Sequence, residues 1–297
     1  MRYTFALFTC VALLTPALAE DPQYLDDVQI KALIEHKGTV LIEAGETVEN
    51  ATLQEQLKQA TVYDAAPPVQ GQLVEGGEGL YDAADDGVIV VTGLYLCGRC
   101  DKFHANCASG FVISEDGLAV TNYHVIEGNT NTTMVAMTRD GRVVPILEVL
   151  AANKADDTAM IRLGKAEDRP FTPVPLARSA QVGERVHAIT HPTGRFYFYA
   201  SGEISRFFMQ RRARNQPPVR RVSITAEYAK GSSGGPIFND AGQVVAMVCS
   251  TNSVYYNQQN GDPRNLQLVF RDCVPYESIL ELFAKDDAGN LRQADAE

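Results

Sequence analysis

Short runs in which apolar and polar residues alternate follow one another along most of this 297-residue chain. Alternation with a period of two predicts half-buried strands, and the Asp-Gly pairs at residues 116–117 and 140–141 predict tight hairpins between them. We expect strands at residues 86–92, 108–114, 118–124, 133–137, 143–149, 158–163, 186–190, 222–226 and 244–248. The pattern therefore predicts a protein of many short strands.

A different pattern precedes the strands. Residues 26–36 begin with two carboxylates and then place apolar residues at helical spacing, which predicts a short amphipathic helix, and residues 52–60 predict a second one. Glycine and proline interrupt the chain between and after these helices. We expect residues 20–75 to form a partly helical N-terminal extension, with an inhibitory role as one alternative. The main domain would span residues 76–285, and residues 286–297 would be a polar tail.

The first residues have the features of a targeting segment. Arg2 precedes an apolar run at residues 5–18, which ends in the small-residue sequence Ala-Leu-Ala at residues 17–19. This predicts a secretory signal peptide at residues 1–19. The run is shorter than the roughly 20 residues that a membrane-spanning helix needs. We therefore expect an exported protein, periplasmic or secreted, without a membrane span once the signal is removed.

Composition narrows the choice of partners. The chain has 37 acidic and 26 basic residues and a formal charge of −11. Because phosphate backbones attract basic surfaces, nucleic acid is not expected as a partner. Hydrophobic residues make up 45% of the chain, which is enough for a packed core.

A glycine-rich turn at residues 230–236 carries the candidate nucleophile, Ser233. A serine hydroxyl reacts poorly at neutral pH unless a base accepts its proton, and that base is usually a histidine oriented by a carboxylate. His124 follows an apolar run and can supply the base. The carboxylate can come from Asp156 or Asp157, which directly precede the run at residues 158–163.

Three motifs in this order resemble those of trypsin-fold serine proteases, and the HtrA/Deg-like branch above all. They are Thr-Asn-x-His-Val-Ile at residues 121–126, Asp-x-Ala-x-Ile-x-Leu at residues 157–163 and Gly-x-Ser-Gly-Gly-Pro at residues 231–236. The resemblance covers residues 88–283 and implies an all-β fold of two six-stranded antiparallel barrels with the active site between them. It also implies a C-terminal helix near residues 276–283, without the PDZ domain usual in the branch.

The resemblance assigns roles to individual residues. His124 would be the general base, Asp157 its orienting partner and Ser233 the nucleophile, which favours Asp157 over Asp156. The backbone N–H groups of Gly231 and Ser233 would form the oxyanion hole. Substrates would be polypeptides, and catalysis would require no cofactor. The oligomeric state is not predicted.

The tentative substrate pocket contains Glu227, Tyr228 and Cys249. Glu227 lies six residues before Ser233, where trypsin-like enzymes place the residue at the base of their specificity pocket, and there it would favour basic side chains. In the HtrA/Deg branch, however, this pocket usually takes small aliphatic residues. Tyr228 can equally fill the pocket, so the cleavage specificity stays open.

Four residues between two predicted strands depart from the family pattern: Cys97, Cys100, His104 and Cys107. Sulfur and nitrogen ligands at this spacing fit a structural zinc ion. The alternative is a disulfide between Cys107 and either Cys97 or Cys100, which an oxidising compartment favours. The resemblance also places Cys249 and Cys273 on neighbouring strands, where they can form a disulfide.

Six arginines crowd residues 206–221 of this acidic protein. We expect a solvated surface loop, with recruitment of acidic substrates as a second hypothesis. Taken together, the sequence predicts an exported serine endopeptidase that acts through an acyl-enzyme intermediate. The alternative is a protein of the same fold that is latent or inactive and acts as a binding or chaperone-like module.

Overall fold

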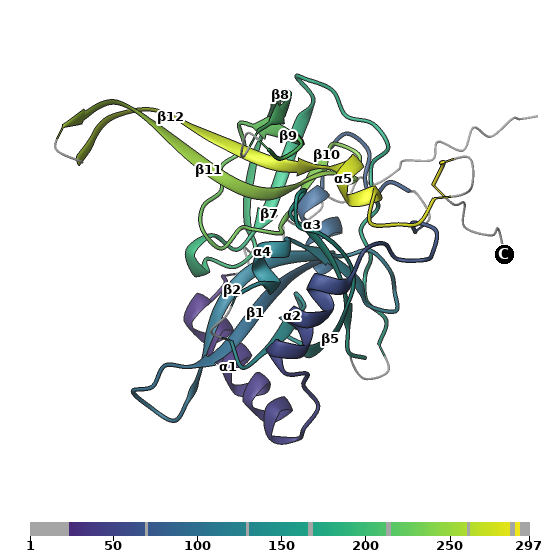
Figure 1. Ribbon diagram of the computed structural model, residues 1–297, viewed down its shortest axis with the longest axis vertical. Coiled ribbons are helices and arrows are strands. Elements are labelled where there is room, and N and C mark those ends of the chain that lie inside the picture. Colours follow the sequence, from purple (N-terminus) through teal and green to yellow (C-terminus); the bar gives the residue numbers. More distant parts are fainter. Residues whose placement is uncertain are drawn as a thin grey trace, which may run out of the picture.

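Two closed six-stranded antiparallel β-barrels make up most of the computed structural model of the protein (Figure 1). The strand order is β1-β2-β3-β6-β5-β4 in the first barrel and β10-β11-β12-β9-β8-β7 in the second. This confirms the predicted all-β fold. The strands are β1 (Val88–Leu96), β2 (Phe103–Val112), β3 (Leu118–Thr121), β4 (Thr133–Met137), β5 (Val143–Asn153), β6 (Thr158–Leu163), β7 (Arg185–Thr190), β8 (Phe198–Gln210), β9 (Val219–Ile224), β10 (Pro236–Asn239), β11 (Val244–Gln259) and β12 (Asp262–Pro275).

The structure describes residues 24–68, 71–128, 131–165, 169–211, 215–259, 262–285 and 289–291. The predicted signal peptide and most of the predicted polar tail lie outside these residues, and so do Arg212 and Arg214. Within them, no helix is both long and apolar enough to cross a membrane.

Strand β1 shows how the barrels pack together. Ile89 and Val91 belong to a hydrophobic cluster that also contains residues of the N-terminal helix α2 (Asn50–Gln59). Val88 and Val90, on the opposite face, belong to a second cluster that takes Met247 from the second barrel. Both faces of β1 are therefore buried, and the second cluster joins the two barrels.

The N-terminal extension packs on the first barrel. Helix α1 (Asp27–Glu43) contacts β2 and β5, and α2 contacts β5. Helix α1 is longer than the helix predicted at residues 26–36, because Gly38 does not interrupt it. A Cβ atom at Gly38 would overlap the Leu94 side chain, so glycine lets the helix approach the barrel closely.

The remaining helices are short. They are α3 (Leu80–Ala84), η1 (Asp85–Gly87), α4 (Tyr123–Ile126), η2 (Pro192–Gly194) and α5 (Tyr276–Leu280). Helix α5 follows the last strand of the second barrel, where the C-terminal helix was predicted, and it ends three residues earlier than expected.

The predicted arginine-rich loop is wrong at both ends. Residues 206–210 lie in β8 and residues 219–221 lie in β9. The Arg221 side chain is 1% exposed, and Arg206 lies over the ring of Phe208. The alternation within residues 219–224 places some of these arginines against the protein instead of in solvent. Charge density alone therefore misidentified a strand as a loop.

Candidate active site

His124 and Asp157 form a bonded pair in the first barrel. His124 Nδ1 lies 2.8 Å from Asp157 Oδ2 and 3.1 Å from Oδ1, and the His124 backbone N–H donates to Oδ1 at 3.0 Å. Because a carboxylate accepts hydrogen bonds, the proton of the neutral imidazole is assigned to Nδ1. Nε2 is then the nitrogen that can accept a proton. His124 lies in helix α4, and not on a strand as predicted, because β3 ends at Thr121.

Two further hydrogen bonds hold Asp157 in place. The buried Asn122 side chain donates to the Asp157 carbonyl oxygen at 3.0 Å, and the Cys249 thiol donates to Oδ2 at 3.3 Å. Burial, followed by the nearby Asp157 charge, raises the pKa of Cys249 to about 12, so this residue remains a thiol donor. Asp157 has a φ of 65°, a left-handed conformation that aspartate tolerates better than most residues.

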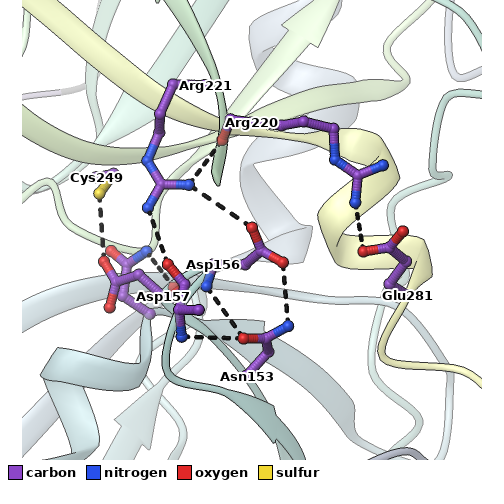
Figure 2. Close-up of polar contacts among 9 residues, drawn as sticks. Asn153, Asp156, Asp157, Arg220, Arg221, Cys249 and Glu281 are labelled. Carbon is purple, nitrogen blue, oxygen red and sulfur yellow. Dashed lines mark hydrogen bonds and ion pairs between the residues drawn. The ribbon is translucent and has the colours of Figure 1, made fainter. Parts of the chain in front are cut away.

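The neighbouring Asp156 points elsewhere. Its Oδ2 accepts a hydrogen bond from Asn153 at 3.0 Å, and its Oδ1 lies 4.0 Å from Arg221 Nη1. Figure 2 shows the Asp156 side chain between Asn153 and Arg221, with Asp157 directed toward Cys249. Of the two aspartates left open by the sequence, only Asp157 contacts His124 in the described part of the chain.

Ser233 lies in the turn before β10, and this turn is bonded to the first barrel. The Ser109 N–H donates to the Ser233 carbonyl oxygen at 2.9 Å, and Ser109 Oγ donates to the Gly231 carbonyl oxygen at 3.0 Å. On the other side, the Gly234 N–H donates to the carbonyl oxygen of Val248 in β11 at 3.1 Å. Both barrels therefore position the turn. No feature of the sequence indicated the hydrogen bonds that Ser109 makes to it.

Two positions of the turn require glycine, because the turn backbone lies very close to neighbouring segments. Gly234 has a φ of 84°, and a Cβ atom there would overlap the Ser109 carbonyl oxygen and Thr121 Oγ1. Gly231 has a φ of 98°, and its Cβ atom would lie 2.6 Å from the His191 carbonyl oxygen. Only glycine fits both the conformation and the space. The tight fit brings the turn next to Thr121, three residues before His124.

The backbone around Ser233 presents two free donors. The Thr193 N–H donates to the Lys230 carbonyl oxygen at 2.6 Å. Because the C=O and N–H of one trans peptide point in opposite directions, this bond directs the Gly231 N–H away from residue 193. Among the described residues, neither the Gly231 N–H nor the Ser233 N–H has a hydrogen-bond partner. Unpaired N–H groups beside a hydroxyl are what an oxyanion hole requires.

The third contact of a triad is not made. Within the described residues, no hydrogen bond joins Ser233 Oγ to His124 Nε2. Catalytic hydrogen bonds are often long without substrate and shorten when it binds. The structure thus brings the three predicted residues to the junction of the barrels, with one bond of the triad formed.

A cavity of about 400 Å³ lies beside His124. Helix α2 of the N-terminal extension forms one side of it, a feature that the sequence did not indicate. The His124 side chain is 46% exposed, so the extension borders this histidine without covering it. The cavity is lined by Gln54, Leu57, Lys58, Tyr123, His124, Glu127 and Gly128.

The three residues of the tentative substrate pocket do not line one pocket. The Glu227 side chain is 76% exposed and pairs with Arg271 at 2.9 Å, which contradicts a place at the pocket base. Tyr228 is buried in the core of the second barrel, and its hydroxyl donates to the carbonyl oxygens of Ser250 and Asp272 at 2.9 and 3.0 Å. Cys249 faces Asp157 instead.

The predicted Cys249–Cys273 disulfide is not formed, and both residues are free thiols. They do lie on paired strands, since Cys273 is the partner of Val248. However, an irregularity in the pairing falls at Cys249, whose thiol turns toward Asp157. Cys273 instead packs in the core of the second barrel. The Cys249 thiol therefore faces the His124–Asp157 pair, whereas the Cys273 thiol lies in the core of the second barrel.

The predicted four-residue zinc set is also corrected. Cys97, Cys100 and His104 place their ligand atoms within 4.8 Å of one another at the end of the β1–β2 hairpin. Cys107 is apart from them, with its Sγ 3.6 Å from Thr92 Oγ1. His104 and Cys107 are three residues apart on one strand, so they face opposite sides of the sheet. Cys107 is a free thiol, as are Cys97 and Cys100, so the alternative disulfide is not formed either.

Comparison with known proteins agrees with this geometry. Residues 108–247 match the family model described as a trypsin-like peptidase domain. The match covers 140 of the 297 residues, slightly less than half of the chain. The matched segment contains His124, Asp157 and Ser233, and it ends in β11, before the last strand of the second barrel.

About half of the chain is also similar to proteins named as serine proteases. The chain is 32% identical over 153 residues to a probable periplasmic serine endoprotease, DegP-like, of Halomonas elongata, covering 52% of this chain and 30% of the relative. It is 31% identical over 149 residues to the putative serine protease HhoB of Synechocystis, covering 50% of this chain and 35% of the relative. These matches therefore span about a third of the length of each relative.

Proposed function

We propose that the protein is an exported serine endopeptidase with Ser233 as nucleophile, His124 as general base and Asp157 as the residue that orients the histidine. One observation carries the proposal: the Asp157 carboxylate holds His124 Nδ1 at 2.8 Å, beside a glycine turn with two unpaired N–H groups. This arrangement leaves Nε2 available as the base, with the Ser233 hydroxyl as the proposed nucleophile and the two N–H groups as the proposed oxyanion site.

The chemistry follows from these positions. Nε2 of His124 accepts the Ser233 proton while Oγ attacks the substrate carbonyl carbon, and the Gly231 and Ser233 N–H groups stabilise the resulting oxyanion. Asp157 stabilises the imidazolium, which then protonates the leaving amine as the peptide bond breaks. Water, deprotonated by His124, attacks the acyl-enzyme, and the released proton returns to Ser233 with the free acid as product. Side chains and backbone N–H groups of the protein carry every step, so catalysis needs no cofactor, and a zinc ion bound near Cys97 would be structural.

We infer that polypeptides bind along the junction of the barrels. The cavity beside His124, with its wall from α2, would hold residues next to the cleaved bond. Tyr228, five residues before Ser233, is buried and its hydroxyl is bonded to both β11 and β12. We infer that its ring takes the place that an open specificity pocket would need, and we therefore expect a small side chain on the acyl side of the bond. A peptide library in which large aromatic residues at that position are cleaved best would contradict this specificity.

Export is the remaining part of the proposal. The Halomonas elongata relative is named as periplasmic, and residues 1–19 have the sequence of a secretory signal. Fractionation of cells that express the full chain tests the idea. A mature protein that begins at Glu20 in the exported fraction is expected, whereas a full-length protein in the cytoplasm would contradict it.

Labelling with a fluorophosphonate tests the active site. The reagent bonds to a serine only where the base and oxyanion site are assembled, and mass spectrometry then locates the adduct. We expect the adduct on Ser233 and none in a Ser233→Ala variant. The alternative, a latent or inactive binding protein, is favoured by the missing Ser233–His124 hydrogen bond. Folded protein that gives no adduct would support that alternative.

A further inference from the structure

The end of the β1–β2 hairpin gathers two thiols and an imidazole. Cys97 Sγ lies 3.6 Å from Cys100 Sγ, and Cys100 Sγ lies 3.2 Å from His104 Nε2. A disulfide would bring the sulfurs to about 2.05 Å. Two thiolates bound to one tetrahedral zinc ion at about 2.3 Å each lie about 3.8 Å apart. The observed separation therefore fits a shared metal ion better than a bond between the sulfurs.

The hairpin itself brings the three side chains together. Leu96 pairs with Phe103, and Tyr95 with His104, so the connecting turn at residues 97–102 lies at the same end of the hairpin as His104. Gly98 has a φ of 71°, which allows the tight turn between the two cysteines. Because all three residues lie on this hairpin, the cluster does not depend on packing between the barrels.

A fourth residue, from a distant part of the chain, supports His104. The Glu35 side chain in α1 accepts a hydrogen bond from the Ala105 N–H at 3.0 Å, and the same oxygen lies 4.0 Å from His104 Nδ1. The other ring nitrogen, Nε2, faces Cys100. Histidines that bind metals through one nitrogen usually direct the other toward a carboxylate or carbonyl, which orients the ring. Figure 1 shows the hairpin extending beside α1.

We propose that Cys97, Cys100 and His104 bind one zinc ion, with Glu35 orienting His104 and a water molecule as the fourth ligand. Thiolate and imidazole ligands favour zinc over the hard cations magnesium and calcium. Binding converts both thiols to thiolates and releases their protons. The ion would close the end of the hairpin and, through His104 and Glu35, fix it to the N-terminal extension. Cys107 takes no part, since its thiol contacts Thr92.

Metal titration tests the site directly. The mature Ser233→Ala protein, which cannot cleave itself, is reduced, stripped with a chelator and titrated with Zn²⁺ against a colorimetric chelator. We expect one equivalent to bind tightly, and Co²⁺ to give a thiolate charge-transfer band and the visible bands of a tetrahedral site. The variants Cys97→Ser, Cys100→Ser and His104→Asn should each lose this binding. Cys107→Ser, a thiol on the same hairpin, should keep it.

Two outcomes would overturn the proposal. One is a reduced protein that binds no stoichiometric metal, and the other is binding that survives Cys97→Ser or is lost in Cys107→Ser. Glu35→Gln should weaken zinc binding about 10- to 100-fold. Glu43→Gln, at an exposed position on the same helix, is the matched control and should leave the affinity unchanged. Equal affinity in the two variants would remove Glu35 from the site.

Protection from proteolysis is an independent measurement. Arg99 and Lys102 lie within the turn that the ion would close, and trypsin cleaves after both residue types. Zinc should slow cleavage at these two bonds in the Ser233→Ala protein by at least about tenfold, because closing the turn restricts the local opening that cleavage needs. The Cys100→Ser variant should show no such effect. Cleavage rates that do not respond to zinc in the reduced protein would contradict a structural role for the ion.

Discussion

The two barrels contribute different halves of the proposed active site, and the halves differ in how completely they are assembled. The first barrel holds His124 and Asp157 in a finished pair with three hydrogen-bond contacts between them. The second barrel supplies Ser233 on a turn whose N–H donors are unpaired. The contact that would join the halves, from Ser233 to His124, is the one not formed. Bonds within the first barrel are thus in place, whereas the bond between the barrels is not formed.

The distance between Ser233 and His124 depends on contacts between the two barrels. Ser109 of the first barrel is bonded to the Ser233 turn. Arg221 of β9 reaches in the other direction, with Nη2 3.5 Å from the Ala155 carbonyl oxygen and Nη1 donating to the Arg220 carbonyl oxygen at 2.7 Å (Figure 2). The Ser109 and Arg221 contacts both lie close to the proposed triad. We therefore infer that they fix the position of Ser233 relative to His124.

Removal of the nucleophile should have the largest effect. Ser233→Ala should lower kcat on a cleavable peptide by about 10⁶-fold, because no other group can form the acyl-enzyme. The neighbouring Ser232 is the matched control: it is buried, and its hydroxyl donates to Thr190 Oγ1 at 2.9 Å. Ser232→Ala should cost about 1 kcal/mol of unfolding free energy and retain fluorophosphonate labelling. A Ser232→Ala protein that is stable but unlabelled would move the nucleophile to that position.

The two adjacent aspartates provide the next test, because they belong to different contacts. Asp157→Asn should lower kcat about 10⁴-fold, since the amide no longer holds His124 in the required tautomer. Asp156→Asn should change kcat by less than about tenfold and should lower stability instead, because Arg221 loses its nearby carboxylate. Steady-state kinetics and urea unfolding of both variants separate the roles. Equal losses of kcat would show that the histidine partner was assigned wrongly.

Sequence motifs were sufficient to predict the contact between His124 and Asp157, because each motif also fixes a local structure. A glycine turn must surround Ser233, and an aspartate must directly precede β6. Alternation predicted nine of the twelve strands but not β8, β10 or β12, and the resemblance implied the two barrels. The links between barrels left no comparable pattern. Ser109 is an ordinary residue of a β-strand, and Arg221 lay within a charged run that indicated solvent exposure.

The thiols show the same limit. Four potential metal ligands within eleven residues suggested one site, but strand parity places Cys107 on the opposite face from His104. The boundaries of β2 were needed to apply that parity, and the sequence analysis had treated residues 97–107 as an insertion. Similarly, Glu227 was assigned to a pocket by its distance from Ser233 along the chain, although its side chain points into solvent.

Loss of the Arg221 contact should have a smaller effect than loss of the triad residues. Arg221→Met should destabilise the fold by about 3 kcal/mol, because Asp156 stays mostly buried without its cation. If Arg221 also positions the second barrel, fluorophosphonate labelling of Ser233 should be slower in this variant, even at temperatures well below its unfolding temperature. Arg221→Lys keeps the charge but loses the planar fork, so it should restore part of the stability and little of the labelling rate. Normal labelling in a destabilised Arg221→Met protein would limit Arg221 to a structural role.

The smallest expected effect concerns the pH dependence of stability. It involves His191, which lies beneath the Ser233 turn. His191 is fully buried, its Nδ1 accepts a hydrogen bond from the Tyr197 N–H at 3.0 Å, and its carbonyl oxygen lies against Gly231. Burial lowers the pKa of His191 from 6.5 to about 3. The unfolded chain therefore binds a proton that the folded protein excludes between these two values. The contribution of His191 to the free energy of unfolding should be complete above about pH 6.5. It should fall as the pH drops toward 3, with a limiting slope of about 1.4 kcal/mol per pH unit from this residue.

Urea unfolding between pH 7.5 and 4.5 should show a shallower dependence of the unfolding free energy on pH in His191→Gln than in the unmodified protein. Equal slopes would mean that groups other than His191 govern acid stability.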